Sequence, residues 1–295
     1  MVDYWVRPMV EGDVAAVERL TDQSYVDLDR RTHRTGWPEP APRTAEQAAG
    51  WSARVSHLVG TDPRGSWVAE DRGGLLGVAL STRRDLTWTL AAFAVRPAEQ
   101  GRGVGRQLLD AASGYGSGCL RAMLIASEDP LALRRYRLAG FTLHPLMMLR
   151  GRVPRSALPV VDRVREGSVG DIDLMDSVDR QVRDAAHGPD HRILTARYRL
   201  VVADRSTGSG YAYALASGQP YLLAATNRRT ATDLLWECLA GSHPDRAMAI
   251  ANISVANEWA LDVGMACRME VWTRNYLALR GMRPPMPYLP SGMFV

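Results

Sequence analysis

Apolar and polar positions along the chain follow two periods, which together predict a mixed α/β protein. Short apolar runs bounded by glycine, proline or charged residues predict strands, and one of them spans residues 86–95. From residue 104 to residue 112 apolar residues recur every three or four positions, which predicts a helix. Residues 67–70 and 75–80 flank a glycine-containing turn and predict a hairpin.

The first sixty residues are expected to form one strand followed by helices. Residues 4–7 predict the strand, and Asp13 is predicted to cap the helix that follows. Residues 21–60 have a mostly helical pattern, but three prolines within residues 36–42 forbid a continuous helix there. Residues 142–151 are expected to form the last strand pair of this half.

The pattern then starts again in the second half of the chain. Arg165 repeats Arg7 and Asp171 repeats Asp13, each within a similar stretch of sequence. The strand-like runs that follow are residues 200–204, 211–215 and 221–226. This internal duplication predicts two tandem domains. The predicted parts are a first domain at residues 1–152, a linker at 153–160 and a second domain at 161–295.

Composition narrows the classes of protein that fit. A length of 295 residues suits two domains, and a hydrophobic content of 46% gives each of them a core. The three cysteines form no C-x-x-C pair, so we expect no disulfide framework, no bound metal and a cytoplasmic location. No uninterrupted apolar run is long enough to predict a membrane span. The net charge of +4 is modest and the basic residues are scattered, so we expect no nucleic-acid partner.

The strand predicted at residues 86–95 leads into a glycine-rich segment, Gln100-Gly101-Arg102-Gly103-Val104-Gly105, and a helix follows at once. Three glycines in five residues let the backbone approach a ligand closely. A helix that begins here directs unpaired N–H groups and the positive end of its dipole at the same place. The segment therefore predicts a pyrophosphate-binding loop. It lacks both the Lys-Ser/Thr pair of a Walker loop and the glycine spacing of the dinucleotide fingerprint.

This loop resembles the acyl-CoA loop of the GNAT superfamily of N-acyltransferases, which has the pattern Q-x-x-G-x-G. Gln100, Gly103 and Gly105 occupy its three defining positions. A second segment, residues 129–141, is similar to the N-x-x-A-x-x-x-Y-x-x-x-G-F motif of the same family. Its matching residues are Ala132, Tyr136, Gly140 and Phe141, while Asp129 stands where the family has asparagine. The resemblance extends over residues 3–150.

The resemblance implies an α/β (α+β) fold of two tandem GNAT-type domains, each with a mixed, mostly antiparallel, twisted sheet flanked by helices. It also implies acetyl-CoA as co-substrate. The residues implied in binding acetyl-CoA are Phe93, Ala94, Val95, Gln100, Gly101, Arg102, Gly103, Val104, Gly105, Arg106 and Asp129. In the family, backbone groups at the positions of Phe93 and Val95 bind the pantetheine arm and polarise the thioester carbonyl. Tyr136 stands at the position of the family's general acid. A tyrosine suits this role because its phenol stays protonated at neutral pH.

The second copy has lost these features. Residues 227–233 replace the glycine loop, and Ala260 stands where the first copy has Tyr136. We therefore expect the second domain to be degenerate, with a structural or substrate-shaping role.

The sequence leaves the general base and the acceptor open. Residues 86–95 contain no carboxylate, so the base is Asp85, Glu70, Ser127 or a water molecule. In the family the first helices close over the acceptor, which makes part of residues 25–42 candidate contacts. These candidates are Tyr25, Asp27, Asp29, His33 and Trp37.

The function predicted from the sequence is direct acetyl transfer from acetyl-CoA to the amine of a small molecule. Two alternatives remain open: a non-catalytic sensor that binds acyl-CoA, and an N-acetyltransferase that acts on proteins or peptides. We expect no membrane partner, and the sequence leaves a homodimer open.

Overall fold

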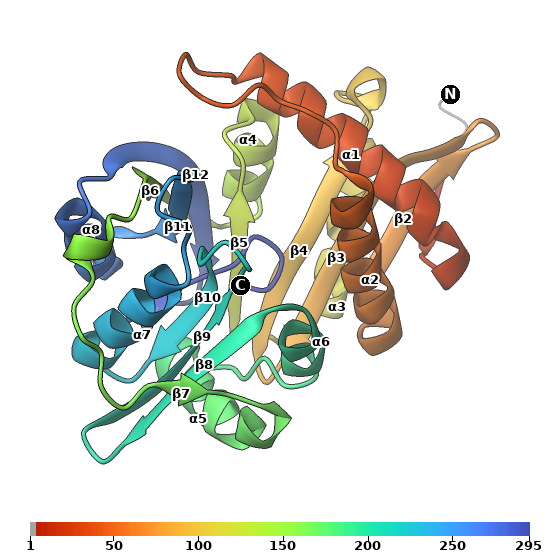
Figure 1. Cartoon of the computed structure of the whole chain (residues 1–295). Coiled ribbons are helices and arrows are strands. Elements are labelled where there is room, and N and C mark those ends of the chain that lie inside the picture. Colours follow the sequence, from red (N-terminus) through yellow and green to blue (C-terminus); the bar gives the residue numbers. More distant parts are fainter. Residues whose placement is uncertain (1–3) are drawn as a thin grey trace. The chain divides into compact units, whose positions relative to one another are not determined.

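The structure is a computed structural model that describes residues 4–295, and its contacts divide the chain into two compact units. The first unit comprises the described residues up to Arg83, together with Thr87–Ala122 and Asp129–Leu131. The second unit comprises Arg84–Leu86, Met123–Glu128 and Ala132–Val295. Figure 1 labels the elements of both units.

The elements up to the linker are β1 (Trp5–Pro8), η1 (Glu11–Asp13), α1 (Val14–Arg31), α2 (Ala45–Thr61), η2 (Pro63–Gly65), β2 (Ser66–Asp71), β3 (Gly74–Arg84), β4 (Thr87–Val95), η3 (Pro97–Glu99), α3 (Val104–Tyr115), β5 (Arg121–Ala126), α4 (Pro130–Leu138) and β6 (Thr142–Gly151).

The remaining elements are η4 (Arg155–Ala157), β7 (Arg165–Glu166), η5 (Val169–Asp171), α5 (Ile172–Arg183), α6 (Asp190–Arg197), β8 (Arg199–Arg205), β9 (Gly208–Ala214), β10 (Pro220–Ala225), α7 (Arg228–Ala240), β11 (Met248–Ile253), η6 (Val255–Asn257), α8 (Trp259–Ala266), β12 (Glu270–Arg280) and β13 (Tyr288–Leu289).

The first unit is a sheet in the order β1-β2-β3-β4, with α1 and α2 on one face and α3 on the other (Figure 1). β2 pairs antiparallel with β1 and with β3, and the hairpin predicted from residues 67–70 and 75–80 is confirmed. Nearly all side chains of β3 and β4 are buried, because helices cover both faces of these strands. The predicted mixed α/β fold with mostly antiparallel sheets is confirmed.

The second unit contains a sheet in the order β13-β10-β9-β8-β7, which α5 and α7 pack against (Figure 1). Strands β8, β9 and β10 form antiparallel pairs at the positions where the duplication predicts a meander. Their side chains join those of α7 and α8 in one apolar core. The second unit therefore has an apolar core of its own, to which Leu149 of β6 also contributes.

β6 pairs with strands from the second half of the chain on both of its edges. Along one edge it is antiparallel to β12, with a register that runs from Glu270 opposite Arg150 to Leu279 opposite Thr142. Along the other edge it is antiparallel to β11. The expected strand pair at residues 142–151 is wrong, because these residues form one long strand whose partners come from later in the chain.

The duplication is visible in hydrogen bonds as well as in sequence. Arg7 binds Asp13 with Nη1–Oδ2 at 2.7 Å, and Arg165 binds Asp171 with Nη2–Oδ1 at 2.5 Å. In both copies the aspartate also accepts from the backbone N–H three residues before it, at 2.9 Å and 2.8 Å. Asp13 is the N-cap residue of α1, as predicted, but its side chain makes no capping bond to the helix: Arg7 and the Val10 N–H hold its carboxylate instead.

The bounds predicted for the two domains follow the sequence duplication, and they stay a prediction. The compact units follow contacts, and these place β6 with the second half of the chain. Residues 153–160 leave β6 through the short helix η4.

Candidate functional site

The glycine-rich loop follows β4, and hydrogen bonds to the neighbouring strand fix the point at which it begins. The Arg96 N–H donates to the Leu76 carbonyl at 2.8 Å, which continues the pairing of β4 with β3 for one more residue. After η3 the Gln100 side chain turns back, and its Nε2 donates to the Val95 carbonyl at 3.1 Å. Gln100 therefore ties the start of the loop to the end of the strand.

The loop backbone turns through conformations that favour glycine. Gly101 has φ +80° and Gly103 has φ +92°, and Gly103 is the N-cap of α3. Residues with a Cβ atom pay a steric penalty in this left-handed region. In the part of the chain that the structure describes, the N–H groups of Gly103, Val104 and Gly105 donate to no carbonyl oxygen. N–H groups at a helix start, together with the positive end of the helix dipole, are suited to bind an anion.

Gly105 lies in close contact with the strand that precedes the loop. A Cβ atom at this position would lie 3.2 Å from Phe93 Cζ and 3.4 Å from Val95 Cγ2. The glycine therefore lets the first turn of α3 pack against β4. The structure thus brings the strand residues 93–95 and the loop residues 100–106 together, as the resemblance implies.

The two arginines of the loop are exposed. Arg102 Nη1 lies 2.5 Å from Glu99 Oε2, and Arg106 Nε lies 3.7 Å from Asp110 Oδ2. Exposed ion pairs of this kind contribute little to stability because water and salt screen them. Both guanidinium groups can therefore exchange these partners for phosphate oxygens at small cost.

Tyr25 of α1 contacts the middle of β4. The Phe93 backbone hydrogen-bonds the Tyr25 hydroxyl oxygen, and burial raises the pKa of that hydroxyl above its usual value. The Arg43 guanidinium lies 5.7 Å from the centre of the Tyr25 ring and 4.6 Å from that of Trp51. Arg43 also binds Glu18 at 3.0 Å. These contacts attach the segment between α1 and α2 to α1 beside Tyr25.

Asp129 has a structural role at the start of α4. Its Oδ1 accepts from the Leu131 N–H at 2.8 Å, as a capping residue does. Its Oδ2 lies 3.7 Å from Arg31 Nη2. An aspartate can make this cap as well as the asparagine that is usual in the family. Its predicted contact with acetyl-CoA stays a prediction.

Tyr136 lies in the last turn of α4, in the second unit, and it is buried. The Phe141 N–H donates to the Tyr136 carbonyl at 3.1 Å, and the Gly140 N–H donates to the Arg137 carbonyl at 3.1 Å. This pair of bonds is a Schellman motif, with Gly140 in the left-handed conformation at φ +85°. The Tyr136 and Phe141 rings pack edge to face at 6.2 Å, and Arg280 Cζ lies 5.2 Å from the centre of the Phe141 ring. The helix end and its packing therefore fix the Tyr136 side chain.

Two candidates for the general base have structural partners. Glu70 Oε1 lies 2.7 Å from Arg7 Nε, and this hydrogen bond holds the pKa of Glu70 below its usual range. Asp85 Oδ2 accepts from the Ala186 N–H at 2.9 Å and lies 3.4 Å from Arg180 Nε. Both carboxylates therefore have structural partners, and the general base stays open among Asp85, Glu70, Ser127 and water.

The second copy has an ordinary helix start at the position of the glycine loop. Asn227 caps α7, and its side chain accepts from the Thr230 N–H at 2.9 Å. In the first copy the N-cap of the helix is Gly103, which has no side chain to make such a bond. Ala260 is buried in the apolar core of this half.

A comparison with family models matches residues 62–143 to the acetyltransferase (GNAT) domain. The whole chain is similar in fold to a protein from Pyrococcus horikoshii classed as a candidate acetyltransferase. The TM-score is 0.72 at 15% identity over 100% of this chain and 94% of the other. A GCN5-related N-acetyltransferase from Sphaerobacter thermophilus has a TM-score of 0.58 at 15% identity, over 99% and 98% of the two chains.

A GCN5-related N-acetyltransferase from Kribbella flavida also has a TM-score of 0.58 at 15% identity, over 94% of this chain and 70% of the other. A search of curated protein sequences finds no match to the chain. Residues 62–143 are thus similar to an acetyltransferase (GNAT) domain, and the fold likeness extends over both halves of the chain. From Tyr4 onward, no helix is long and apolar enough to cross a membrane.

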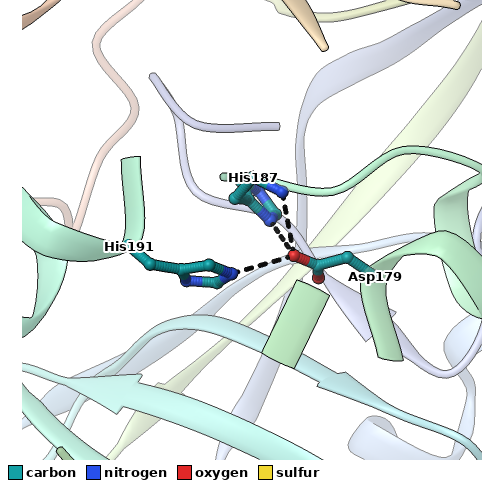
Figure 2. Close-up of side chains that lie close together, drawn as sticks. All are labelled: Asp179, His187 and His191. Atoms are coloured by element: carbon teal, nitrogen blue, oxygen red, sulfur yellow. Dashed lines mark hydrogen bonds and ion pairs between the residues drawn. The ribbon is translucent and has the colours of Figure 1, made fainter. Parts of the chain in front are cut away.

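The sequence interpretation missed one group of polar residues in the second half. Asp179, His187 and His191 lie close together and are buried (Figure 2). Burial lowers the pKa of His191, but its contacts with Asp176 and Asp179 outweigh this effect and raise the pKa to about 9. Burial together with Arg183 lowers the pKa of His187, although Asp179 acts in the opposite direction. The available signal was the spacing H-x-x-x-H at residues 187–191, a few residues after an aspartate-rich helix.

Proposed function

We propose that this chain is an acetyl-CoA-dependent N-acetyltransferase that acts on the amine of a small molecule in the cytoplasm. The observation that carries the proposal is the start of α3. There, the N–H groups of Gly103, Val104 and Gly105 lie beside β4 and donate to no carbonyl oxygen among residues 4–295. A pyrophosphate bound here would accept hydrogen bonds from these groups and interact favourably with the helix dipole.

The strand residues 93–95 would hold the pantetheine arm and the thioester. Extended backbone offers N–H and carbonyl groups in alternation, which suits the two amides of pantetheine. One N–H of the strand would polarise the thioester carbonyl. The Phe93 N–H can donate to an oxygen from this position, since it does so to the hydroxyl oxygen of Tyr25. We assign Phe93, Ala94 and Val95 to this role, and Gln100, Gly101, Arg102 and Arg106 to positioning and neutralising the phosphates.

Transfer would proceed directly from acetyl-CoA to the acceptor. The lone pair of the neutral amine attacks the carbonyl carbon, a C–N bond forms and the C–S bond breaks. The departing thiolate takes a proton from the Tyr136 hydroxyl, and the proton lost by the amine restores the tyrosine. A phenol near pKa 10 and a thiol near 8.5 are close enough for this exchange. The products are the acetylated amine and the free thiol of coenzyme A.

The acceptor would approach the thioester beside Tyr25 and the segment that follows α1. The Tyr25 hydroxyl contacts the Phe93 backbone, so it would lie next to the thioester carbon if the strand holds acetyl-CoA as proposed. Within the same segment, His33 Nε2 lies 3.3 Å from the Trp37 carbonyl oxygen, which holds the loop in a defined turn. Changing Tyr25 to Phe should therefore raise KM for the amine more than KM for acetyl-CoA.

Release of the coenzyme A thiol across a panel of acceptors tests this function. The panel contains small primary amines, amino sugars, polyamines and short peptides with free N-termini or lysines. Amine-dependent thiol release with at least one small amine, at a higher kcat/KM than with any peptide, supports the proposal. Faster turnover of peptides would instead support protein acetylation. Tight binding of acetyl-CoA without release in any sample would support a sensor.

A further inference from the structure

A buried cluster of three side chains in the second unit has no part in the proposed reaction. We call Asp179, His187 and His191 the His–Asp cluster. Asp179 is on α5, His187 is in the connection that follows α5, and His191 is in the first turn of α6. None of the three side chains is more than 2% exposed. Burial of three ionisable groups is costly unless partners compensate each of them.

Each imidazole directs one nitrogen at the Asp179 carboxylate. His187 Nδ1 lies 2.6 Å from Asp179 Oδ2, and His191 Nε2 lies 3.1 Å from the same oxygen (Figure 2). One ligand atom from each residue lies within 4.8 Å of the other two. The three atoms therefore converge on one point inside the protein.

The second nitrogen of each ring and the second oxygen of the carboxylate all face tyrosine hydroxyls. His191 Nδ1 lies 3.1 Å from Tyr213 Oη, and His187 Nε2 lies 3.5 Å from Tyr288 Oη. The Tyr211 hydroxyl donates to Asp179 Oδ1 at 2.5 Å. Hydrogen bonds from outside fix the orientation of metal-binding histidines in this way, since they determine which ring nitrogen keeps its proton.

We propose that the His–Asp cluster binds one divalent transition-metal ion of the zinc class. Two imidazole nitrogens and one carboxylate oxygen form a ligand set that Zn²⁺ takes in proteins. Asp176 Oδ1 lies 3.3 Å from His191 Nε2 and is the oxygen placed to act as a fourth ligand. With two carboxylates and two neutral imidazoles, the charge of the bound ion would be balanced within the site.

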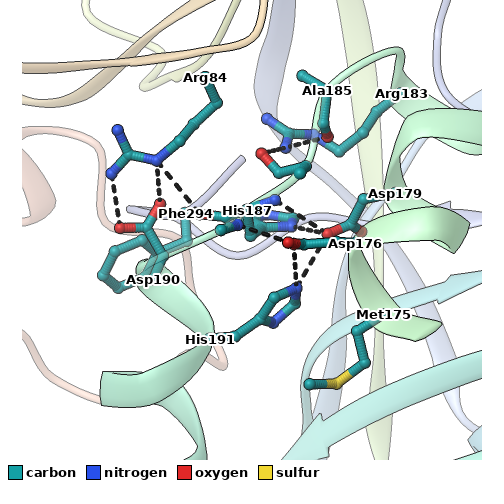
Figure 3. Close-up of polar contacts among 12 residues, drawn as sticks. Arg84, Met175, Asp176, Asp179, Arg183, Ala185, His187, Asp190, His191 and Phe294 are labelled. Carbon is teal, nitrogen blue, oxygen red and sulfur yellow. Dashed lines mark hydrogen bonds and ion pairs between the residues drawn. The ribbon is translucent and has the colours of Figure 1, made fainter. Parts of the chain in front are cut away.

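The role of this ion would be structural, because it would connect α5 to the start of α6 (Figure 3). The connection and the first residue of α6 also bind Arg84 at the end of β3. Arg84 Nη2 lies 2.8 Å from Asp190 Oδ1, and the Arg84 Nε–H donates to the His187 carbonyl at 3.2 Å. Nearby, the Arg183 guanidinium donates to the carbonyls of Ala185 and Val295. Removal of the ion would therefore loosen the contacts made by residues 184–190.

The sequence interpretation expected no metal because the cysteines form no zinc motif. That argument does not cover a site built from histidine and aspartate, whose ligands come together only in the folded chain. This inference is independent of the proposed function, since it concerns a different group of residues and a different ligand.

Metal content of the full-length chain tests the proposal. The purified protein is unfolded with chelator, refolded with Zn²⁺, dialysed, and assayed for zinc by mass spectrometry. We expect about one ion per chain in the wild type, and less than about a fifth of that in His187→Gln and in His191→Gln. The control variant is His243→Gln, which should keep the wild-type content because His243 is outside the cluster.

Two readouts keep the test decisive if the variants fold poorly. Refolding of the wild type with Co²⁺ should give the visible absorption bands of a tetrahedral ion. Chelation should lower the Tm of the wild type by about 5 °C or more, as expected when a ligand binds only the folded state. A wild type without bound zinc, cobalt bands or a chelator effect would overturn the proposal. Zinc retained equally by both cluster variants would overturn it as well.

Discussion

Changing Gly103 to Ala is the sharpest perturbation of the proposed acetyl-CoA site. Gly103 has φ +92° and is exposed, and the atom nearest to an added Cβ would be Tyr4 Oη at 3.6 Å. That distance is an ordinary contact, so the cost to the fold is backbone strain alone. Strain in the left-handed region costs about 1–2 kcal/mol. At roughly 2–4 °C per kcal/mol, the Tm should fall by about 2–8 °C.

Binding of acetyl-CoA should fall by more than this strain explains. The added methyl group would lie at the start of α3, where the pyrophosphate must approach the N–H groups of residues 103–105. We expect the dissociation constant to rise at least tenfold, which corresponds to about 1.4 kcal/mol. Isothermal titration calorimetry at a temperature at which the variant is fully folded measures this constant.

Gly118→Ala is the matched control for this variant. Gly118 is also exposed, has φ +85°, and has no atom within 4 Å of an added Cβ. It lies after the C-terminal end of α3, far along the helix from the loop. The two variants should lose similar stability, but only Gly103→Ala should lose affinity. Equal affinities in the two variants would refute the assignment of the loop to acetyl-CoA.

Three further predictions follow from the structure. Tyr136→Phe should lower kcat by about tenfold to a thousandfold with an unchanged acetyl-CoA affinity, as loss of a general acid does; steady-state kinetics and calorimetry check both parts. Arg7→Met should cost up to about 1 kcal/mol at pH 7 and less at pH 3. The reason is that Arg7 lowers the pKa values of Asp13 and Glu70, so its contribution is present at neutral pH and is lost as the pH falls through those values; urea melts at both pH values measure it. The fragment 1–152 should fail to fold stably, because β6 loses both of its partner strands; circular dichroism and thermal melts of the fragment decide this.

Each of these three predictions has a result that would contradict it. Unchanged turnover in Tyr136→Phe would leave that residue a packing role. A stability loss in Arg7→Met that is the same at pH 3 and pH 7 would separate Arg7 from the two carboxylates. A folded, soluble 1–152 fragment would show that the pairing of β6 is not needed for the first half to fold.

Features that depend on local sequence were predicted well. The hairpin of β2 and β3, the strand β4 and the helix α3 follow from short-range patterns of apolar residues and glycine. Gln100 and the glycines of the loop were identifiable because the same few residues define both the turn and the N-terminus of the helix. The repeated pair Arg165 and Asp171 was identifiable because the whole motif lies within seven residues.

Features that depend on contacts between distant residues were not predicted. The two partners of β6 come from more than ninety residues later in the chain, and an apolar run does not specify its neighbours. The interactions of Asp85 with Ala186 and Arg180 likewise exist only in the folded chain. The His–Asp cluster combines an aspartate of α5 with one histidine from the connection after α5 and one from the start of α6. A single histidine in a sequence does not show that it is buried or which side chains it contacts, so the cluster was not predicted.

The number of acetyl-CoA molecules bound per chain tests the central claim most directly. The claim is that the first half of the duplication keeps a working acyl-CoA loop and that the second half, with Asn227 at the equivalent helix start, does not. Calorimetric titration of the full-length chain with acetyl-CoA should give a stoichiometry of one, and Gly103→Ala should weaken that single site. A stoichiometry of two, or a single site unaffected by Gly103→Ala, would contradict the account.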